Sequence, residues 1–368
     1  MSVAFLVSLL LWAAPRTEAQ PLKVLADQDS AGPQGTNFLS LLMLLQDPGV
    51  ELLGITTVTG DQWVDQETLF ALHALELTGR MEVPVVKGAR MPFLNNPSDQ
   101  ERREGLFGSH PTWHGAFNPD APQPDFTWEP PGGYPRLKPG LGHAANFIVE
   151  TIRKYPGEVV IYAAGPLTNI ALAVRLDPEV VRLTRALYLM GGSSGGGWEL
   201  NWWWDPEAAA IVLREPWREM VVTTFEAGAQ VWSHERMMRR IAEAGGRLSQ
   251  HIRALYLDYR PPPGTSLWSM MWDELSVATL LLPSVVKRWE TLYLDVVIDH
   301  GGKYGHTLVW RQPEGVPSFF LPYSGPAPLD GAKWLGHLDP PYNRKRARVP
   351  LEVDVEKFED FLVRVLSR

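Results

Sequence analysis

Two aspartates stand one residue apart at the end of an apolar run near the start of the chain. Asp27 and Asp29 close the segment KVLADQD, and Gly32 and Gly35 follow before a second apolar segment begins. A strand, a glycine-containing loop and a helix in this order are typical of a phosphate-binding loop. Two carboxylates would repel a phosphate, and neither GxxxxGK with Ser or Thr nor GxGxxG is present. We therefore interpret the loop as a site for a hard cation, because Ca²⁺ prefers carboxylate and carbonyl oxygens.

Other residues that could do chemistry also follow apolar runs. Asp61 comes after GITTVTG, Ala164 ends EVVIYAA before Gly165, Met190 ends RALYLM, and Asp273 stands at an expected helix start. In open parallel sheets, ligands bind beyond the carboxyl ends of the strands. We expect these residues to gather at one edge of a sheet.

The elements that position these residues alternate between strand-like and helix-like segments. This alternation predicts an α/β fold with one open, mostly parallel (mixed) sheet and helices on both faces. Residues 91–140 are rich in Pro, Gly and aromatic side chains and predict a long loop or lid. The expected strands cover 23–27, 50–59, 83–88, 158–165, 185–192, 219–224 and part of 291–311; the expected helices cover 37–46, 64–79, 143–154, 167–175, 206–214, a region up to about 259, a segment from Asp273 and 353–366.

Composition bounds the class of protein. The chain has 368 residues, 45% of them hydrophobic, enough for one large α/β domain or two smaller ones, and the alternation of segments favours one. Its 34 basic and 42 acidic residues give a net charge of -8, which argues against nucleic acid as the partner. The basic run RKRAR at 344–348 is interpreted as a solvated loop. The absence of cysteine excludes disulfides, thiolate metal sites and a cysteine nucleophile.

The first residues, MSVAFLVSLLLWAAPRTEAQ, hold a short apolar segment followed by a small-x-small pattern at Thr17 and Ala19. These features predict a signal peptide over residues 1–19 and a periplasmic or secreted protein without a membrane anchor after cleavage. No Lys or Arg precedes the apolar run, so a mis-assigned start or a disordered leader stays an alternative.

Six segments in order resemble the nucleoside hydrolases, the inosine-uridine-preferring family. They are Asp27-x-Asp29, LLGITTVTGD, FIVETIRKYPGEVVIYAAGPLTNIALA, LYLMGG, WELNWWWDPEAA and MWDELSVATLLL, and the similarity covers nearly all of residues 22–368. The resemblance implies a nucleoside-hydrolase-like catalytic domain that binds one Ca²⁺ and hydrolyses the N-glycosidic bond of ribonucleosides. Related enzymes are often dimers or tetramers, so a homo-oligomer is compatible with the resemblance.

The resemblance also assigns the metal site. Asp29 matches the aspartate that binds the metal and takes the proton from the attacking water, and Asp273 matches the distant metal-binding aspartate. The main-chain carbonyl of Ala164 matches a further metal ligand. Such a site combines general-base catalysis with an oxocarbenium-like sugar.

The residues that match the sugar site are Glu199 and Asn201, with the main chain of Met190 nearby. Two residues apart, Glu199 and Asn201 would point the same way from an extended segment. Asp61 stands where the family has an asparagine that touches the sugar, so the acceptor is kept and a donor is lost.

The metal loop departs from the family pattern DxDPGxDD. Its last carboxylate corresponds to Asn37, eight residues after Asp29, and Thr36 stands where the other aspartate would be. The loop is three residues longer than the pattern. We assign Asn37 to the metal and Thr36 to the substrate; Thr36 could instead be a helix N-cap. Asn lacks the bidentate charge of a carboxylate, so metal affinity should fall.

The leaving-group side departs as well. Many members have a histidine where this chain has Trp272. Tryptophan cannot deliver a proton at neutral pH, but it can stack on a purine. This resembles the purine-specific branch and predicts a catalytic and substrate-binding role for Trp272 with a purine preference. Trp113 is a candidate second stacking residue, and His110 and His114 in the lid could reach the site.

Simpler interpretations stay open. Asp27 is more consistent with support of the strand end than with metal binding, and Asp205 before Pro206 indicates a helix cap. Asp29 and Asp273 could cap helices or turns. For the whole protein, the alternatives are a non-catalytic sugar- or nucleoside-binding protein on the same fold and an N-hydrolase of another ribosylated compound.

Overall fold

The computed structural model describes residues 20–108, 113–118, 129–261, 266–311 and 346–368. The predicted signal peptide and His110 therefore lie outside the described residues. Within these ranges, no helix is long and apolar enough to span a membrane.

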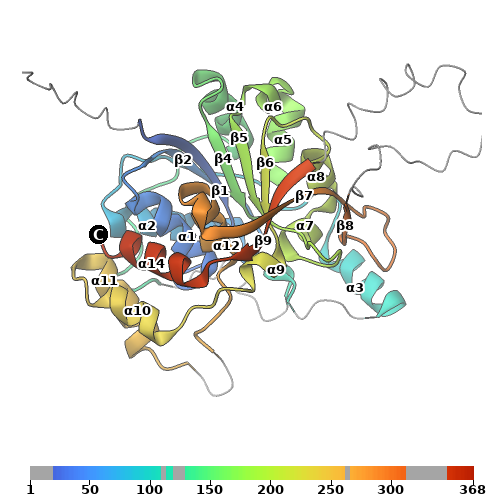
Figure 1. The fold of residues 1–368 in the computed structure, drawn as a ribbon. Helices are drawn as coiled ribbons and strands as arrows, with labels where there is room; N and C mark the ends of the chain where they lie inside the picture. The colour runs from blue at the N-terminus through green and yellow to red at the C-terminus, as the bar shows by residue number, and fades with distance from the viewer. Residues whose placement is uncertain (1–19, 109–112, 119–128, 262–265, 312–345) are drawn as a thin grey trace, which may run out of the picture.

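The described residues form one nine-stranded sheet in the order β3-β2-β1-β4-β5-β6-β9-β7-β8 (Figure 1). Neighbours from β3 to β9 pair in parallel, whereas β7 is antiparallel to both β9 and β8. The predicted open, mixed α/β sheet is thus confirmed. The strands are β1 (Leu22–Gln28), β2 (Val50–Thr57), β3 (Val85–Lys87), β4 (Val160–Ala164), β5 (Ala186–Met190), β6 (Met220–Thr223), β7 (Val286–Val296), β8 (Thr307–Trp310) and β9 (Arg346–Val353).

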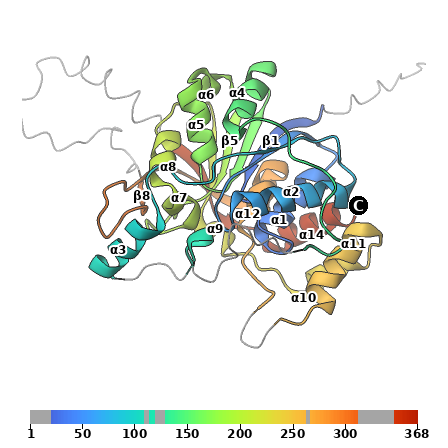
Figure 2. The ribbon, with the colours of Figure 1, turned by 180° about the vertical axis from the view of Figure 1, so that it is seen from behind.

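Helices cover both faces of the sheet (Figures 1 and 2). On one face lie α1 (Thr36–Gln46), α2 (Val64–Thr78), α10 (Glu235–Ala242), α11 (Gly246–Ile252), a π-helical turn (Arg253–Asp258), α12 (Trp272–Leu281) and α14 (Val355–Leu366). On the other lie α4 (Ala144–Lys154), α5 (Thr168–Leu176), α6 (Glu179–Leu183) and α8 (Pro206–Leu213). The remaining short elements are α3 (Pro97–Phe107), α7 (Leu200–Trp204), α9 (Phe225–Gly228) and 3₁₀ turns at Gly115–Phe117 and Pro283–Val285.

The central strands are apolar along their length because both faces are covered. In β1, Val24 and Ala26 enter the core beneath α1 and α12, whereas Leu25 enters the core beneath α4 and α5. Side chains alternate between the faces of a strand, so a strand that is buried on both faces needs an unbroken apolar run.

Two parts of the sequence interpretation are wrong. Residues 91–140 contain a helix, α3, capped by the Asn96 side chain and with Pro97 in its first turn. Its buried side chains are the polar Gln100 and Arg103, so it lacks an apolar stripe. The run RKRAR is not wholly a loop, since β9 begins at Arg346 and pairs with β7; residues 344–345 lie outside the described ranges.

Candidate active site

The loop after β1 places Asp29 at the carboxyl end of a central strand. Asp29 is fully buried. Its Oδ1 accepts a hydrogen bond from Asn37 Nδ2 at 2.7 Å, and its Oδ2 accepts one from the backbone N–H of Asp61 at 3.0 Å. Asn37, at the far end of the stretched loop, therefore lies directly beside Asp29.

Two glycines make room for this carboxylate. A Cβ on Gly60 would lie 2.1 Å from Asp29 Oδ2, and a Cβ on Gly165 would lie 2.8 Å from the Asp29 backbone nitrogen. Real Cβ contacts are not this short. The loops after β2 and β4 thus approach Asp29 only because they carry glycine at these positions.

Asp29 belongs to a group of mutually repelling carboxylates. Burial raises its pKa well above the ordinary value, and the charges of Asp61, Glu67 and Asp273 raise it further. The pKa values of these three neighbours are raised as well, each mainly by burial. Among the described residues, none of the four carboxylates forms a salt bridge. A buried negative cluster without a basic partner is stabilised by a bound cation or by protons.

Asp273 reaches this cluster from the start of α12. Its Oδ2 accepts a 2.7 Å hydrogen bond from Gln28 Nε2, and its main-chain carbonyl accepts one from the Tyr162 hydroxyl at 3.1 Å. The other amide atom, Gln28 Oε1, is buried without a hydrogen-bond partner in the described structure. β1 and α12, far apart in the sequence, thus meet through Gln28.

Thr36 joins α1 to α12. Its hydroxyl accepts the Asp273 N–H at 2.9 Å and donates to Glu274 at 2.5 Å. The interpretation of Thr36 as the N-cap of its own helix is wrong, because Gly35 occupies that position and Thr36 is the first helical residue. The substrate-binding role of Thr36 stays a prediction. In this structure its hydroxyl is hydrogen-bonded to Asp273 and Glu274.

Ala164 and Asp27 face different surroundings. Ala164 is buried at the end of β4 and pairs with Gln28 of β1, so it lies at the edge that carries Asp29.

Asp27 Oδ1 accepts hydrogen bonds from Thr56 Oγ1 and from Asn169 Nδ2, the latter at 2.8 Å. Asp27 therefore ties strand ends together, as the simpler interpretation expected, and burial raises its pKa to about 6.

The predicted sugar residues lie on a short helix and not on an extended segment, which corrects the sequence interpretation. Glu199 is the N-cap of α7 and accepts hydrogen bonds from the N–H groups of Asn201 and Trp202. It also accepts the Gly192 N–H at 2.8 Å. Asn201 Nδ2 donates to the Met190 carbonyl at 3.2 Å, so all three predicted sugar residues come together by a different local geometry. Burial raises the pKa of Glu199 to about 7 although these N–H groups lower it.

Trp272 precedes Asp273 at the first turn of α12. Its indole N–H donates to the Phe225 carbonyl at 3.2 Å, and its ring packs at 5.5 Å between centroids against the Phe225 ring. A Cβ on Gly228 would lie 2.1 Å from the Trp272 ring, so α9 needs glycine there. The N–H of this partly buried indole is therefore engaged and not free to donate elsewhere.

The segment after α3 approaches the site at Asp61. Trp113, which is 39% exposed, donates its indole N–H to Asp61 Oδ1 at 2.7 Å. The Ala116 N–H donates to the Gly60 carbonyl at 2.8 Å. His114 instead pairs with Glu104 at 2.7 Å. Of the two described residues expected to reach the site, Trp113 and His114, Trp113 contacts the predicted site residue Asp61.

Sequence reasoning missed the residues that brace the long loop after β1. Gln34 donates to the Leu255 carbonyl at 2.9 Å, and the Gly35 N–H donates to the Tyr256 hydroxyl at 2.8 Å. His251 Nε2 lies 3.2 Å from the Pro33 carbonyl. These partners come from α11 and the π-helical turn, more than 200 positions after the loop in the chain, and they belong to no sequence motif.

Asp205 is the N-cap of α8, as expected from the sequence.

The donor atoms around Asp29 fit a hard cation. The described residues contain no group of three Asp, Glu, His or Cys side chains arranged to hold a metal. The predicted ligand set differs from such a group, because it joins two carboxylates, Asp29 and Asp273, to the Ala164 carbonyl and the Asn37 amide. Asn37 presents its nitrogen to Asp29, so its predicted role as an oxygen ligand requires the opposite amide orientation. The uncompensated buried charge favours a cation here.

Comparison with known proteins identifies the class. A family model described as inosine-uridine preferring nucleoside hydrolase matches residues 24–360. The chain therefore belongs to this family, and the prediction of a hydrolase that acts on N-glycosyl compounds is confirmed.

Individual relatives agree with this assignment. The chain is 30% identical over 272 residues to "Probable uridine nucleosidase 2" of Arabidopsis thaliana, which is 72% of this chain and 78% of that protein. It is 25% identical over 299 residues to "Pyrimidine-specific ribonucleoside hydrolase RihB" of Escherichia coli, 78% of this chain and 86% of that protein.

Solved structures share the fold. A plant nucleoside hydrolase, PpNRh1, superposes with a TM-score of 0.69 at 22% identity, covering 94% of this chain and 99% of that chain. A purine-preferring ribonucleoside hydrolase from Gardnerella vaginalis gives a TM-score of 0.67 at 21% identity, covering 94% and 98%. The family therefore includes relatives named for pyrimidine and for purine nucleosides.

Proposed function

We propose that this protein is a Ca²⁺-dependent ribonucleoside hydrolase with a purine preference, which releases free base and ribose. The observation that carries the proposal is the fully buried Asp29 at the end of β1, surrounded by Asp61, Glu67 and Asp273 without a basic partner. This arrangement suits a bound cation and a carboxylate that can take a proton.

Asp29, Asp273, the Ala164 carbonyl and Asn37 would hold the ion. Bound Ca²⁺ supplies a fixed positive charge that makes a neighbouring water more acidic. Asp29 would be ionised beside the ion, because a nearby positive charge lowers the pKa of a carboxyl that burial raises.

Asp29 acts as the general base. Its Oδ2 accepts a hydrogen bond from the Asp61 N–H, and this contact is kept when the Asn37 amide turns its oxygen toward the ion. A base held in this way removes a proton from the attacking water as positive charge develops on the sugar.

Glu199, Asn201 and the Met190 carbonyl bind the ribose hydroxyls. Glu199 is held by three backbone N–H groups, so its carboxylate keeps one orientation. Asp61 adds a further acceptor, whose Oδ1 accepts a hydrogen bond from the Trp113 indole. Rigid acceptors of this kind align the anomeric carbon with the water.

Trp272 stabilises the departing base by stacking. Because its N–H is bonded to the Phe225 carbonyl, the ring cannot act as a proton donor. A purine offers a larger face than a pyrimidine, and stacked aromatic pairs contribute about 0.5–1.5 kcal/mol beyond their buried area. This supports a purine preference.

The test is a panel of inosine, adenosine, guanosine, uridine and cytidine, assayed with CaCl₂ and with EDTA. We expect release of free base with calcium and higher kcat/KM for the purines. Trp272→Leu should lower kcat/KM for inosine more than for uridine, whereas Trp289→Leu, at a tryptophan of β7 that lies against Arg348, should leave both unchanged. Higher kcat/KM for uridine than for inosine would reject the purine preference.

A second candidate is hydrolysis of another ribosylated compound. Asp61, held by Trp113, and the stretched loop both reshape the sugar pocket relative to the family pattern. Activity on a ribosylated compound in the absence of activity on the five nucleosides would favour this candidate. Binding of a nucleoside by calorimetry with no product would instead favour a binding protein on the same fold.

We also propose export through cleavage near residue 19, which N-terminal sequencing of the protein recovered from its native host would test. Assembly into a homo-oligomer is a further proposal, to be tested by light scattering.

A further inference from the structure

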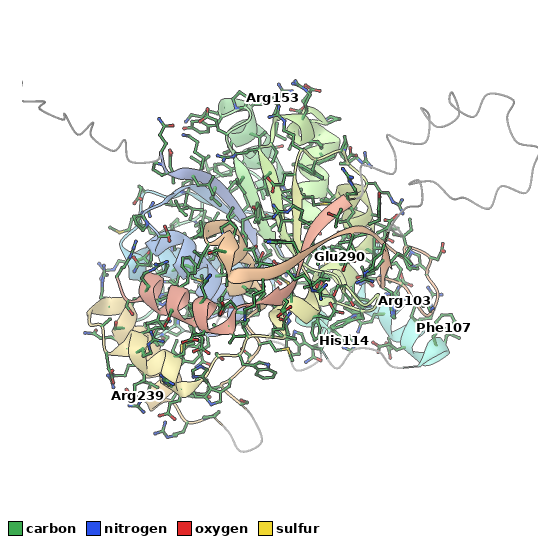
Figure 3. The ribbon with its side chains drawn as sticks, in the orientation of Figure 1. Arg103, Phe107, His114, Arg153, Arg239 and Glu290 are labelled. Carbon is green, nitrogen blue, oxygen red and sulfur yellow. The ribbon has the colours of Figure 1, made fainter. Side chains whose placement is uncertain are left out.

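A small cavity lies beside α3, away from the Asp29 cluster. It has a volume of about 30 Å³ and lies between α3, the side chains of Trp198 and Trp203, and the segment joining β7 to β8. Gln100, Arg103, Trp198, Trp203 and Tyr304 are among the residues that line it. Figure 3 places Arg103 and Phe107 along α3, with His114 on the same side of the molecule.

Arg103 is unusual because it is charged and only 7% exposed. Its Nη2 donates to Asn95 Oδ1 at 2.5 Å, and its guanidinium lies 4.2 Å from the centre of the Tyr304 ring. Its Nη1 is buried without a hydrogen-bond partner in the described structure. A buried guanidinium that lacks a contact with an anion is costly to retain.

The acidic groups nearby are engaged with other partners. Asp99 pairs with Arg102 at 2.9 Å, and Glu104, which also lines the cavity, pairs with His114 at 2.7 Å. Glu207 accepts the Tyr304 hydroxyl at 2.8 Å and lies 3.7 Å from His300. Among the described residues, none of these carboxylates forms a salt bridge with Arg103.

Two other lining residues have an unsatisfied polar atom. Trp198 Nε1, a donor, and Gln100 Oε1, an acceptor, are both buried without a partner within the described ranges. With Arg103 Nη1 there are three such atoms in these lining residues. Two of them, Trp198 Nε1 and Arg103 Nη1, are hydrogen-bond donors, and the guanidinium carries a positive charge. Leaving such buried groups unpaired destabilises the folded protein.

We propose that this cavity binds a small anion, held by the Arg103 guanidinium and the Trp198 indole N–H. Its volume suits a single ion or functional group such as chloride, a carboxylate or a phosphate group. The anion has two sources. It is a free ion, or it is the anionic 5′ group of a ligand bound at the sugar site, because Trp198 directly precedes Glu199.

Thermal unfolding of the whole protein tests the site. The probes are sodium chloride, formate and phosphate, each compared at the same ionic strength with the salt of the bulky gluconate anion. We expect at least one probe to raise the Tm by about 2 °C or more at saturation. This part of the test uses the protein without substrate and does not depend on the proposed function.

Variants identify the residue responsible. Arg103→Gln should abolish the anion-dependent rise in Tm, Arg103→Lys should keep part of it, and Arg102→Gln, an exposed neighbour on α3, should keep all of it. If Arg103→Gln does not fold, Trp198→Phe keeps an aromatic ring, removes the N–H and should reduce the rise. A Tm that no probe raises, or a rise that is undiminished in Arg103→Gln or in Trp198→Phe, would overturn the proposal.

The source of the anion is found with inosine and inosine 5′-monophosphate as ligands of the Asp29→Asn protein. This part rests on the proposed function. Greater stabilisation by the monophosphate that Arg103→Gln removes would assign the cavity to a 5′ phosphate. Equal stabilisation by both ligands, with the rise in Tm from free anions intact, would assign it to a free ion.

Discussion

Calcium should stabilise this protein at pH 8 and hardly at all at pH 5. Burial and mutual repulsion raise the pKa values of Asp29, Asp61, Glu67 and Asp273, so in the absence of metal these groups take up protons as the pH falls. Protons and Ca²⁺ therefore compete for the same oxygens.

The loss of stability between pH 5 and pH 8 can be estimated from Glu199, a buried carboxyl near the cluster. A carboxyl whose pKa is raised on folding contributes stability that is complete below its unfolded pKa and is lost as the pH rises through its folded pKa. For Glu199, raised from 4.5 to about 7, the loss between those pH values is about 3 kcal/mol. Calcium at about 100 times its Kd would restore about 2.7 kcal/mol at pH 8.

Unfolding can be followed by tryptophan fluorescence, at pH 5 and pH 8, with calcium or EDTA. In EDTA, we expect the Tm to be higher at pH 5 than at pH 8. Calcium should raise the Tm by several degrees at pH 8 but not at pH 5. Asp273→Asn should lose most of the calcium effect, whereas Asp360→Asn, at a 62% exposed site on α14, should keep it. Equal stabilisation by calcium at both pH values would refute the reasoning.

Three further substitutions test other parts of the site. Tyr256→Phe removes the acceptor of the Gly35 N–H, and this should lower the free energy of unfolding by about 1–3 kcal/mol. It should also weaken calcium binding, which calorimetry measures. An unchanged affinity for calcium would show that this hydrogen bond does not position the loop. Trp113→Phe removes the indole donor to Asp61, and the loss of about 1 kcal/mol should raise the KM for inosine about fivefold with little change in kcat. A change in kcat alone would contradict a binding role. Asn201→Ala removes the donor to the Met190 carbonyl and should lower kcat/KM about tenfold in steady-state assays, while unaltered kcat/KM would exclude it from the sugar site.

The sheet could be predicted because burial on both faces imposes unbroken apolar runs. The segment KVLAD and the runs before Ala164 and Met190 form strands as expected, and parallel order brings their carboxyl ends together. β9 was missed because Arg346 and Arg348 dominate its composition. Both are exposed and flank the buried Ala347, so the strand alternation was present but masked by charge.

The site residues could be predicted by type but not by local geometry. Glu199 and Asn201 were expected on an extended segment, but Glu199 caps α7, a role that Glu fills less often than Asp or Ser. Glu67 was not singled out because an acidic residue in the first turn of a helix is ordinary. The brace from Leu255 and Tyr256 depends on tertiary packing across more than 200 residues, which no local pattern records.

The central claim is that Asp29 activates water for attack on the sugar. The most direct measurement is a single-turnover reaction with inosine and calcium in H₂¹⁸O, followed by mass spectrometry of the released ribose, for the native protein and for Asp29→Asn. We predict one ¹⁸O in the ribose and a rate at least about 10³ times lower in Asp29→Asn, in the range expected for loss of general-base catalysis. An Asp65→Asn protein, altered at a carboxylate paired with Lys87 and Arg90, should keep the native rate. Ribose without ¹⁸O, or an Asp29→Asn protein as fast as the native one, would contradict the claim.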